Sequence, residues 1–147
     1  MKKLLLPLLL AGAPAFAQLP ALHARPEKND DTIVLTLPDE GRAVWQRAAG
    51  VLAARGYTFR YSDADLLTIS TDYVRLESYD TIGLFVRVEG NRLLLRGRWL
   101  PDDDVTGNGY AISMGGFLSG SGSKWAELEA AARELGGTPG YYNSAAR

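Results

Sequence analysis

The sequence predicts an α+β domain in which an antiparallel sheet of about five strands carries two helices on one face. Two amphipathic stripes with helical spacing lie near residues 44–52 and 125–135. Between and before them lie β-branched or alternating segments, and a Gly-Asn pair marks a tight hairpin. The expected order of elements is therefore β-α-β-β-β-β-α.

The first strand and the first helix follow directly from local signals. Residues 32–37, TIVLTL, form a β-branched, apolar run of strand length. Pro38 ends the run and suits the first turn of a helix, where Asp39 and Glu40 would lie near the positive end of the helix dipole. Gly56 suits the end of the helix. The stripe of this helix consists of Val44, Trp45, Ala48, Val51 and Leu52.

Two short alternating runs follow the first helix. With residues 62–66 as the loop between them, Tyr61 is expected opposite Leu67, and Tyr57 opposite Thr71. This register places the apolar residues of both strands on one side of the sheet, and a slip of one residue would reverse a strand's faces.

The next hairpin turns at Gly90-Asn91, a pair that readily supplies positive φ. On its core side the expected cross-strand pairs are Val88 with Leu93, Val86 with Leu95, Leu84 with Gly97 and Ile82 with Trp99. On the opposite side they are Glu89 with Arg92, Arg87 with Leu94, Phe85 with Arg96 and Gly83 with Arg98. One face is apolar and the other is polar, so we expect the first to face the helices.

A long connection over residues 101–122 leads to the second helix. Ser123 suits the N-cap, and Gly136-Gly137 suits the end of this helix. A tail with Pro139, Tyr141 and Tyr142 follows. The apolar stripe of the helix consists of Trp125, Leu128, Ala131 or Ala132, and Leu135.

The N-terminal residues resemble a secretory signal peptide. Lys2 and Lys3 precede an apolar run, and residues 15–17 form an A-x-A cleavage site, which assigns 1–17 to the signal. We expect a flexible tether over 18–31, a single α+β domain over 32–142 and a tail over 143–147. The chain has no cysteine and no later segment apolar enough to span a membrane, so a periplasmic or secreted protein without disulfides is expected.

The charge balance argues against nucleic acid as a partner. Removing residues 1–17 takes away two of the sixteen basic residues and none of the seventeen acidic ones, which leaves a net charge of −3. Nucleic-acid binding depends largely on basic contacts to phosphate.

Nucleophilic catalysis has little support in the sequence. A Ser-His or Cys-His arrangement needs a positioned base, but cysteine is absent and His23, the one histidine, falls in the expected tether. Carboxylates such as Asp63, Asp72 and Asp80 leave open a small carboxylate-dependent hydrolase acting on glycan, if two of them converge. A non-enzymatic protein is the favoured interpretation.

The stretch PDDDVTGNGY, residues 101–110, partly matches a calcium-binding loop. Asp102, Asp104 and Gly107 take its first, third and sixth positions, but the twelfth is Ser113 instead of glutamate. A solvated connection without a cofactor is favoured, with calcium bound by Asp102, Asp104 and Asn108 as the alternative.

The outer face of the hairpin is the main candidate for binding. Phe85, Arg87, Arg96 and Arg98 lie on it together. A solvated face covered by arginine stems is the simpler interpretation, and a docking surface is the functional one, since aromatic and arginine residues are enriched where partners bind. We expect a binding or adaptor domain for an envelope protein or other acidic ligand, with homodimerisation through this face as an alternative.

Several residues resemble the helix-grip type of small envelope domain, such as the repeated domains of the C-type lipoprotein of the β-barrel assembly machinery. They are residues 35–38, Trp45, residues 52–57 and Asp63, within a similarity that covers about residues 32–100. The resemblance implies a non-catalytic adaptor or binding domain. The chain departs from the lipoprotein pattern because it has no lipid-bearing cysteine and one such domain instead of two.

Overall fold

The computed structural model describes residues 20–103, 107–115 and 122–145 as an α+β fold. In chain order its elements are β1 (Thr32–Thr36), α1 (Arg42–Ala54), β2 (Phe59–Asp63), β3 (Thr68–Thr71), β4 (Val74–Arg75), β5 (Thr81–Glu89), β6 (Arg92–Leu100), β7 (Tyr110–Ala111), α2 (Gly122–Leu135) and β8 (Thr138–Tyr142). The expected signal peptide lies outside the described residues.

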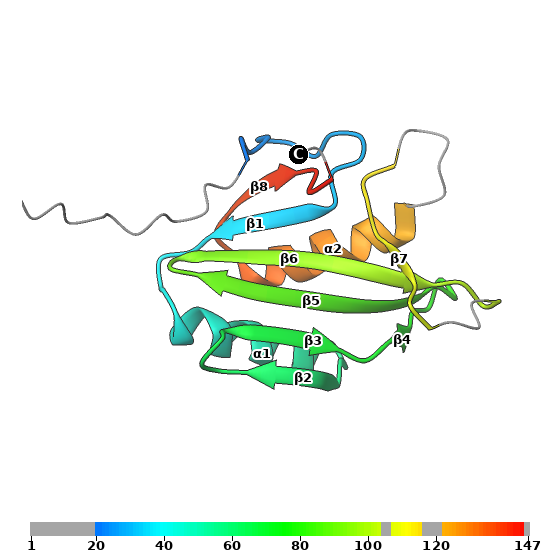
Figure 1. Ribbon diagram of the computed structural model, residues 1–147, viewed down its shortest axis with the longest axis horizontal. Coiled ribbons are helices and arrows are strands. Elements are labelled where there is room, and N and C mark those ends of the chain that lie inside the picture. Colours follow the sequence, from blue (N-terminus) through cyan, green and yellow to red (C-terminus); the bar gives the residue numbers. More distant parts are fainter. Residues whose placement is uncertain (1–19, 104–106, 116–121, 146–147) are drawn as a thin grey trace, which may run out of the picture.

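The strands form one antiparallel sheet with the order β2-β3-β5-β6-β1-β8. Both helices lie behind the same face of this sheet (Figure 1). The α+β fold with two helices and an antiparallel sheet is confirmed. The expectation of about five strands is wrong, because the described residues form eight. The short strands β4 and β7 pair with the ends of β5 and β6, and β8 forms from the segment expected to be a tail.

The core lies between the helices and the inner face of the sheet. The α1 stripe buries Val44, Ala48 and Leu52, as its spacing predicts. Trp45 is half-buried, and its indole Nε1 donates to the Thr68 carbonyl at 3.2 Å, which ties α1 to β3. The α2 side of the core contains Trp125, Leu128, Ala131, Ala132 and Leu135.

The hairpin of β5 and β6 has the register that its sequence predicts. Every expected pair is present, from Glu89 with Arg92 at the turn to Ile82 with Trp99. Gly90 supplies the positive φ of the turn, at 61°. Alternation therefore sends one set of side chains to the core and the other to the outer face.

The expected register between β2 and β3 is wrong. Phe59 lies opposite Thr71 and Tyr61 lies opposite Ser70, because a bulge interrupts the pairing between Phe59 and Tyr61. The turn into β3 also places Leu67 at a φ of 52°, a conformation that its sequence does not announce.

Helix α1 begins later than expected. Its first residue is Arg42, so Asp39 and Glu40 precede the first turn instead of lying in it. Residues 37–41 instead contact the β5–β6 turn, where the Leu37 amide donates to the Asn91 carbonyl and the Gly41 amide donates to the Gly90 carbonyl. These bonds fix the connection from β1 to α1.

The segment before β1, for which the sequence predicts a tether, is hydrogen-bonded to β8. His23 and Tyr141 exchange two backbone hydrogen bonds, of 2.8 and 3.0 Å. The His23 ring Nδ1 lies 3.0 Å from Oδ2 of buried Asp30 and 3.7 Å from the Glu27 carboxylate. These contacts hold residues 23–31 along the β8 edge of the sheet.

Neither of the helices in the described ranges is long and apolar enough to cross a membrane. Helix α2 begins at Gly122, so Ser123 lies in its first turn, where its hydroxyl donates to Asp80. The Lys124 ammonium lies 2.8 Å from the same carboxylate. Gly136 and Gly137, both at positive φ, end α2 as expected.

Candidate functional site

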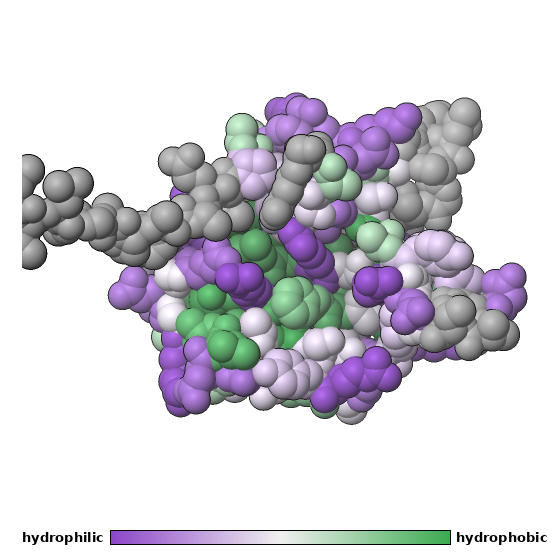
Figure 2. All heavy atoms as spheres, in the orientation of Figure 1, coloured by the Kyte–Doolittle hydropathy of each residue, from purple (hydrophilic) through white to green (hydrophobic). Residues whose placement is uncertain are grey.

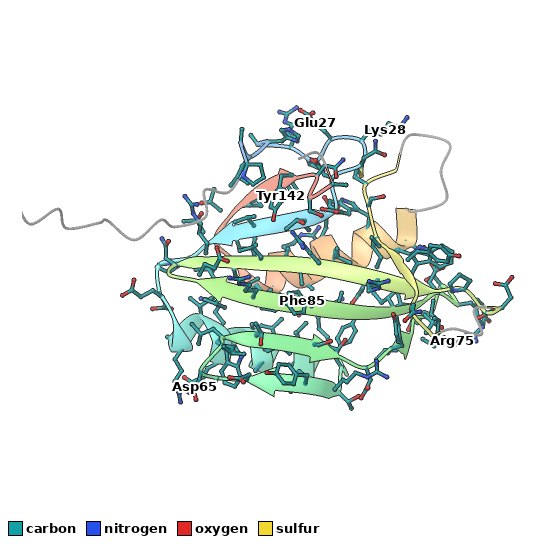
Figure 3. All side chains as sticks on the ribbon, viewed as in Figure 1. Glu27, Lys28, Asp65, Arg75, Phe85 and Tyr142 are labelled. Carbon is teal, nitrogen blue, oxygen red and sulfur yellow. The ribbon has the colours of Figure 1, made fainter. Side chains whose placement is uncertain are left out.

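The outer face of the sheet is only partly apolar. Val34, Leu94 and Tyr142 form a small buried cluster on its β1 and β8 side. Phe85, labelled in Figure 3, lies near the middle of this face with 38% of its surface exposed. Figure 2 shows hydrophobic residues over the middle of the sheet with hydrophilic residues directly beside them. This mixture differs from the inner face, where apolar residues pack against the helices.

A hollow of about 570 Å³ lies on this outer face, and we call it the basin. Its floor comes from β3, β5 and β6. One side is formed by Tyr73 and by residues 107, 108 and 111, and the other by Asp31 and Ser144. The lining residues are Asp31, Arg60, Ser70, Thr71, Tyr73, Gly83, Leu84, Phe85, Arg96, Gly97, Arg98, Gly107, Asn108, Ala111 and Ser144.

Gly83 lets the Tyr73 ring pack closely on the floor of the basin. It lies opposite Arg98 on the outer side of the hairpin, at a position where alternation would otherwise place a side chain. An added Cβ would lie 3.4 Å from the Tyr73 ring, which is ordinary van der Waals contact. The missing side chain thus leaves room for the Tyr73 ring, which covers Gly83.

Arg96 is held in place by two hydroxyl groups. Its Nε donates to Thr32 Oγ1 at 2.8 Å, and its Nη2 donates to the Tyr142 hydroxyl at 2.9 Å. Thr32 and Tyr142 are both buried, so these contacts fix the guanidinium against the sheet. No carboxylate of the described residues lies within ion-pair distance of Arg96, and its remaining N–H groups stay available for a ligand.

Arg98 is positioned in a similar way by a neutral oxygen. Its Nη2 donates to the Gly109 carbonyl at 2.7 Å, which ties β6 to the connection before β7. Arg60, the third arginine of the basin, lies 3.6 Å from Asp72 with both side chains substantially exposed. An exposed pair of this kind contributes little free energy and leaves Arg60 free to reorient.

Asp31 is the one carboxylate among the lining residues. It accepts hydrogen bonds from the Thr32 hydroxyl at 2.8 Å and from the Ser144 amide at 2.9 Å, and the Ser144 hydroxyl donates to it as well. Its oxygens are therefore engaged by neighbouring donors, while three guanidinium groups line the same hollow. The basin is electropositive within an acidic chain, which favours an anionic ligand.

The structure brings together three of the four outer-face residues proposed from the sequence. Phe85, Arg96 and Arg98 line the basin, but Arg87 does not. The Nε of Arg87 instead lies 2.9 Å from Glu89 on the same strand. Alternation predicts that all four share a face, but it cannot show where that face is hollowed.

Two of the three residues of the calcium alternative lie in the described structure. The side chain of Asp102 is 76% exposed and lies 3.8 Å from Arg75, whereas Asn108 lines the basin. Asp104 lies outside the described residues. Within ranges 20–103, 107–115 and 122–145, no three His, Cys, Asp or Glu side chains cluster as a metal site.

The carboxylates considered for catalysis each have local partners. Asp63 accepts the Leu66 and Asp65 amides, and these bonds hold its pKa below the ordinary value. Asp72 accepts the Thr58 hydroxyl at 3.0 Å. Asp80 is bound by Ser123 and Lys124 at the start of α2. None of the three carboxylates lines the basin.

Sequence reasoning did not identify the two sides of the basin. Tyr73, Asn108, Asp31 and Ser144 come from segments far apart along the chain, and no local pattern joins them. The glycine at position 83 was the available signal, since a glycine within an alternating strand often marks a close approach to a ligand or backbone. A comparison with protein-family models and a search of curated proteins both gave no match.

Proposed function

We propose that this chain is a small exported binding domain of the cell envelope, without enzymatic activity, that holds an acidic ligand in the basin. The observation that carries the proposal is the pair Arg96 and Arg98. Both guanidinium groups are fixed by neutral oxygens and line one hollow with few opposing charges. Residues 1–17 support export, because they have the pattern of a signal peptide.

The basin has features that favour binding over catalysis. Arg96 and Arg98 lie on β6, a strand in the middle of the sheet, and neutral oxygens hold their guanidinium groups, so their positions are set before a ligand arrives. Such preorganisation lowers the entropic cost of binding. The carboxylate of Asp31 accepts hydrogen bonds from hydroxyl and amide donors, so it is not placed as an evident general base.

A charge reversal with a matched control tests the proposal. The purified protein is immobilised and exposed to an envelope extract, alongside the Arg98→Glu and Arg87→Glu variants. We expect Arg98→Glu to weaken capture of the bound component about tenfold or more, because it places a carboxylate beside the anion. Arg87→Glu, outside the basin, should capture as wild type does.

Equal capture by the wild type and both variants would contradict the proposal. A loss caused by Arg87→Glu alone would move the binding surface away from the basin. Because the Gly109 carbonyl is the only hydrogen-bond partner seen for the Arg98 side chain in the described residues, a melting curve of Arg98→Glu close to that of the wild type serves as the folding control.

A further inference from the structure

The shape of the basin limits the size of its ligand. A hollow of about 570 Å³ falls within the range of roughly 300–1,000 Å³ found for small-molecule clefts. Tyr73 and Asn108 border one side, and Asp31 and Ser144 border the other. The Tyr73 hydroxyl donates weakly to the Asn108 carbonyl at 3.3 Å, so the first side is a connected wall. A compact ligand that enters the hollow fits this enclosure.

Two arginines of the basin lie close together along β6. Arg96 and Arg98 are two residues apart on β6 and point to the same face, so their Cα atoms lie about 7 Å apart. Across the hairpin, Phe85 lies opposite Arg96 and Gly83 lies opposite Arg98. An oxyanion in the basin would have the guanidinium groups of Arg96 and Arg98 among its lining. Guanidinium forks match carboxylate and phosphate oxygens in pairs.

The apolar part of the basin lies beside these two arginines. Phe85 is the exposed large hydrophobic residue of the floor, and Tyr73 provides a second aromatic side chain at the border. In Figure 3 the Phe85 label marks the centre of the face, between β3 and β6. A ligand that carries a flat or apolar body next to its charged group could therefore bury that body on Phe85 while the arginines hold the charge.

We propose that the ligand of the basin is a small organic oxyanion, with a carboxylate or phosphate group bound by Arg96 and Arg98 and an aromatic or apolar body resting on Phe85. This inference rests on the proposed function, since it names the ligand class for the same site. It excludes a bare inorganic anion as the best ligand, because such an ion would leave the Phe85 ring uncovered.

Four probes separate the parts of this proposal. Benzoate and phenyl phosphate combine a ring with an oxyanion, inorganic phosphate is the oxyanion alone, and phenol is the ring alone. Amide chemical shifts of the labelled full chain are followed during titration with each probe. We expect the first two to move the signals of residues 83–85 and 96–98 with dissociation constants of about 1 mM. Phosphate should bind about tenfold more weakly, and phenol should not saturate.

Three variants assign the contributions. Arg98→Gln should weaken both ring-bearing anions about tenfold, and Phe85→Ala should remove their advantage over phosphate. Arg87→Gln is the matched control, because it changes an outer-face arginine outside the basin, and it should bind as wild type does. The relative affinity of benzoate and phenyl phosphate tells which oxyanion the basin prefers.

The outcomes distinguish this inference from the proposed function. The small-ligand inference is contradicted if no probe gives saturable chemical-shift changes at basin residues up to about 20 mM. It is also contradicted if phosphate binds as tightly as benzoate and phenyl phosphate, or if Arg98→Gln leaves the affinity for these two probes unchanged. If the probes fail while capture from the envelope extract still depends on Arg98, only the small-ligand inference is lost. If capture is also insensitive to Arg98→Glu, both proposals are lost.

Discussion

Gly97 allows the hairpin to pack closely against α2 and the segment after β7. It lies on the inner side of β6, opposite Leu84. A Cβ added there would lie 2.7 Å from Ile112 Cδ1 and 2.7 Å from Leu128 Cδ1, about 0.7 Å short of the 3.4 Å at which ordinary contact begins. Both neighbours are fully buried and have little room to yield. The methyl group that Gly97→Ala adds would therefore be too close to both Ile112 and Leu128.

We expect Gly97→Ala to lower the free energy of unfolding by about 1–3 kcal/mol. Urea unfolding followed by circular dichroism should show a lower midpoint with an unchanged slope. Ile112→Val removes the clashing Cδ1 and should alone cost about 0.5–1.5 kcal/mol. The double variant should lose less stability than the sum of the two single losses, by about 0.5 kcal/mol or more.

Gly83→Ala is the control for this cycle, because its Cβ would meet only the Tyr73 ring, at 3.4 Å, and Asp72 backbone beyond it. We expect its stability to stay within about 0.5 kcal/mol of wild type. The explanation by close packing is refuted if Gly97→Ala unfolds at the wild-type midpoint, or if its loss adds fully to that of Ile112→Val.

Three further predictions concern titration and the helices. The hydrogen bond that protonated His23 donates to the Asp30 carboxylate raises the pKa of His23, so the stability that this pair contributes is present below pH 6.5 and is lost as the pH rises through the folded pKa. Unfolding midpoints across pH 5.5–8 should show this loss, and His23→Gln should flatten it. Burial raises the pKa of Asp80, but the hydrogen bonds from Lys124, Ser123 and Ser78 outweigh burial and lower this pKa overall. Asp80→Asn should therefore lower the free energy of unfolding by about 1.5–3 kcal/mol at neutral pH, measured by urea unfolding. An unfolding midpoint equal to that of the wild type would contradict a stabilising role. Gly50 lies inside α1 with open space around its Cα, so Gly50→Ala should raise the stability by about 0.5–1 kcal/mol, and a lower melting temperature would show that this space is not free.

The parts of the fold that could be predicted are those with a local repeat. The β5–β6 register follows from one turn and from alternation on both sides of it, since a single slip would bury arginines. The helices follow from their stripes. Strand β8, with the sequence TPGYY, was not predicted, because proline and glycine are poor strand formers and its pairing with β1 comes from the other end of the chain.

The candidate site was predictable to the same degree. Period two places Phe85, Arg96 and Arg98 on one face, and this required no tertiary information. Arg87 lies outside the basin because of the position of the basin's borders. One border is formed by the connections around Tyr73 and Asn108. Long-range placement of irregular segments leaves no periodic trace in a sequence, so the enclosure could be seen only in the structure.

The antiparallel pairing of β1 with β8 has a mechanical consequence. Thr32 at the start of β1 lies opposite Tyr142 at the end of β8, and Thr36 lies opposite Thr138 at the far end of the pair. A force that pulls Thr32 and Tyr142 apart would therefore act at one end of this ladder and load its hydrogen bonds one after another. Such unzipping needs less force than shearing, in which all bonds resist together. Separating β8 from β1 in this way also removes the hydroxyl of Tyr142 that holds Arg96.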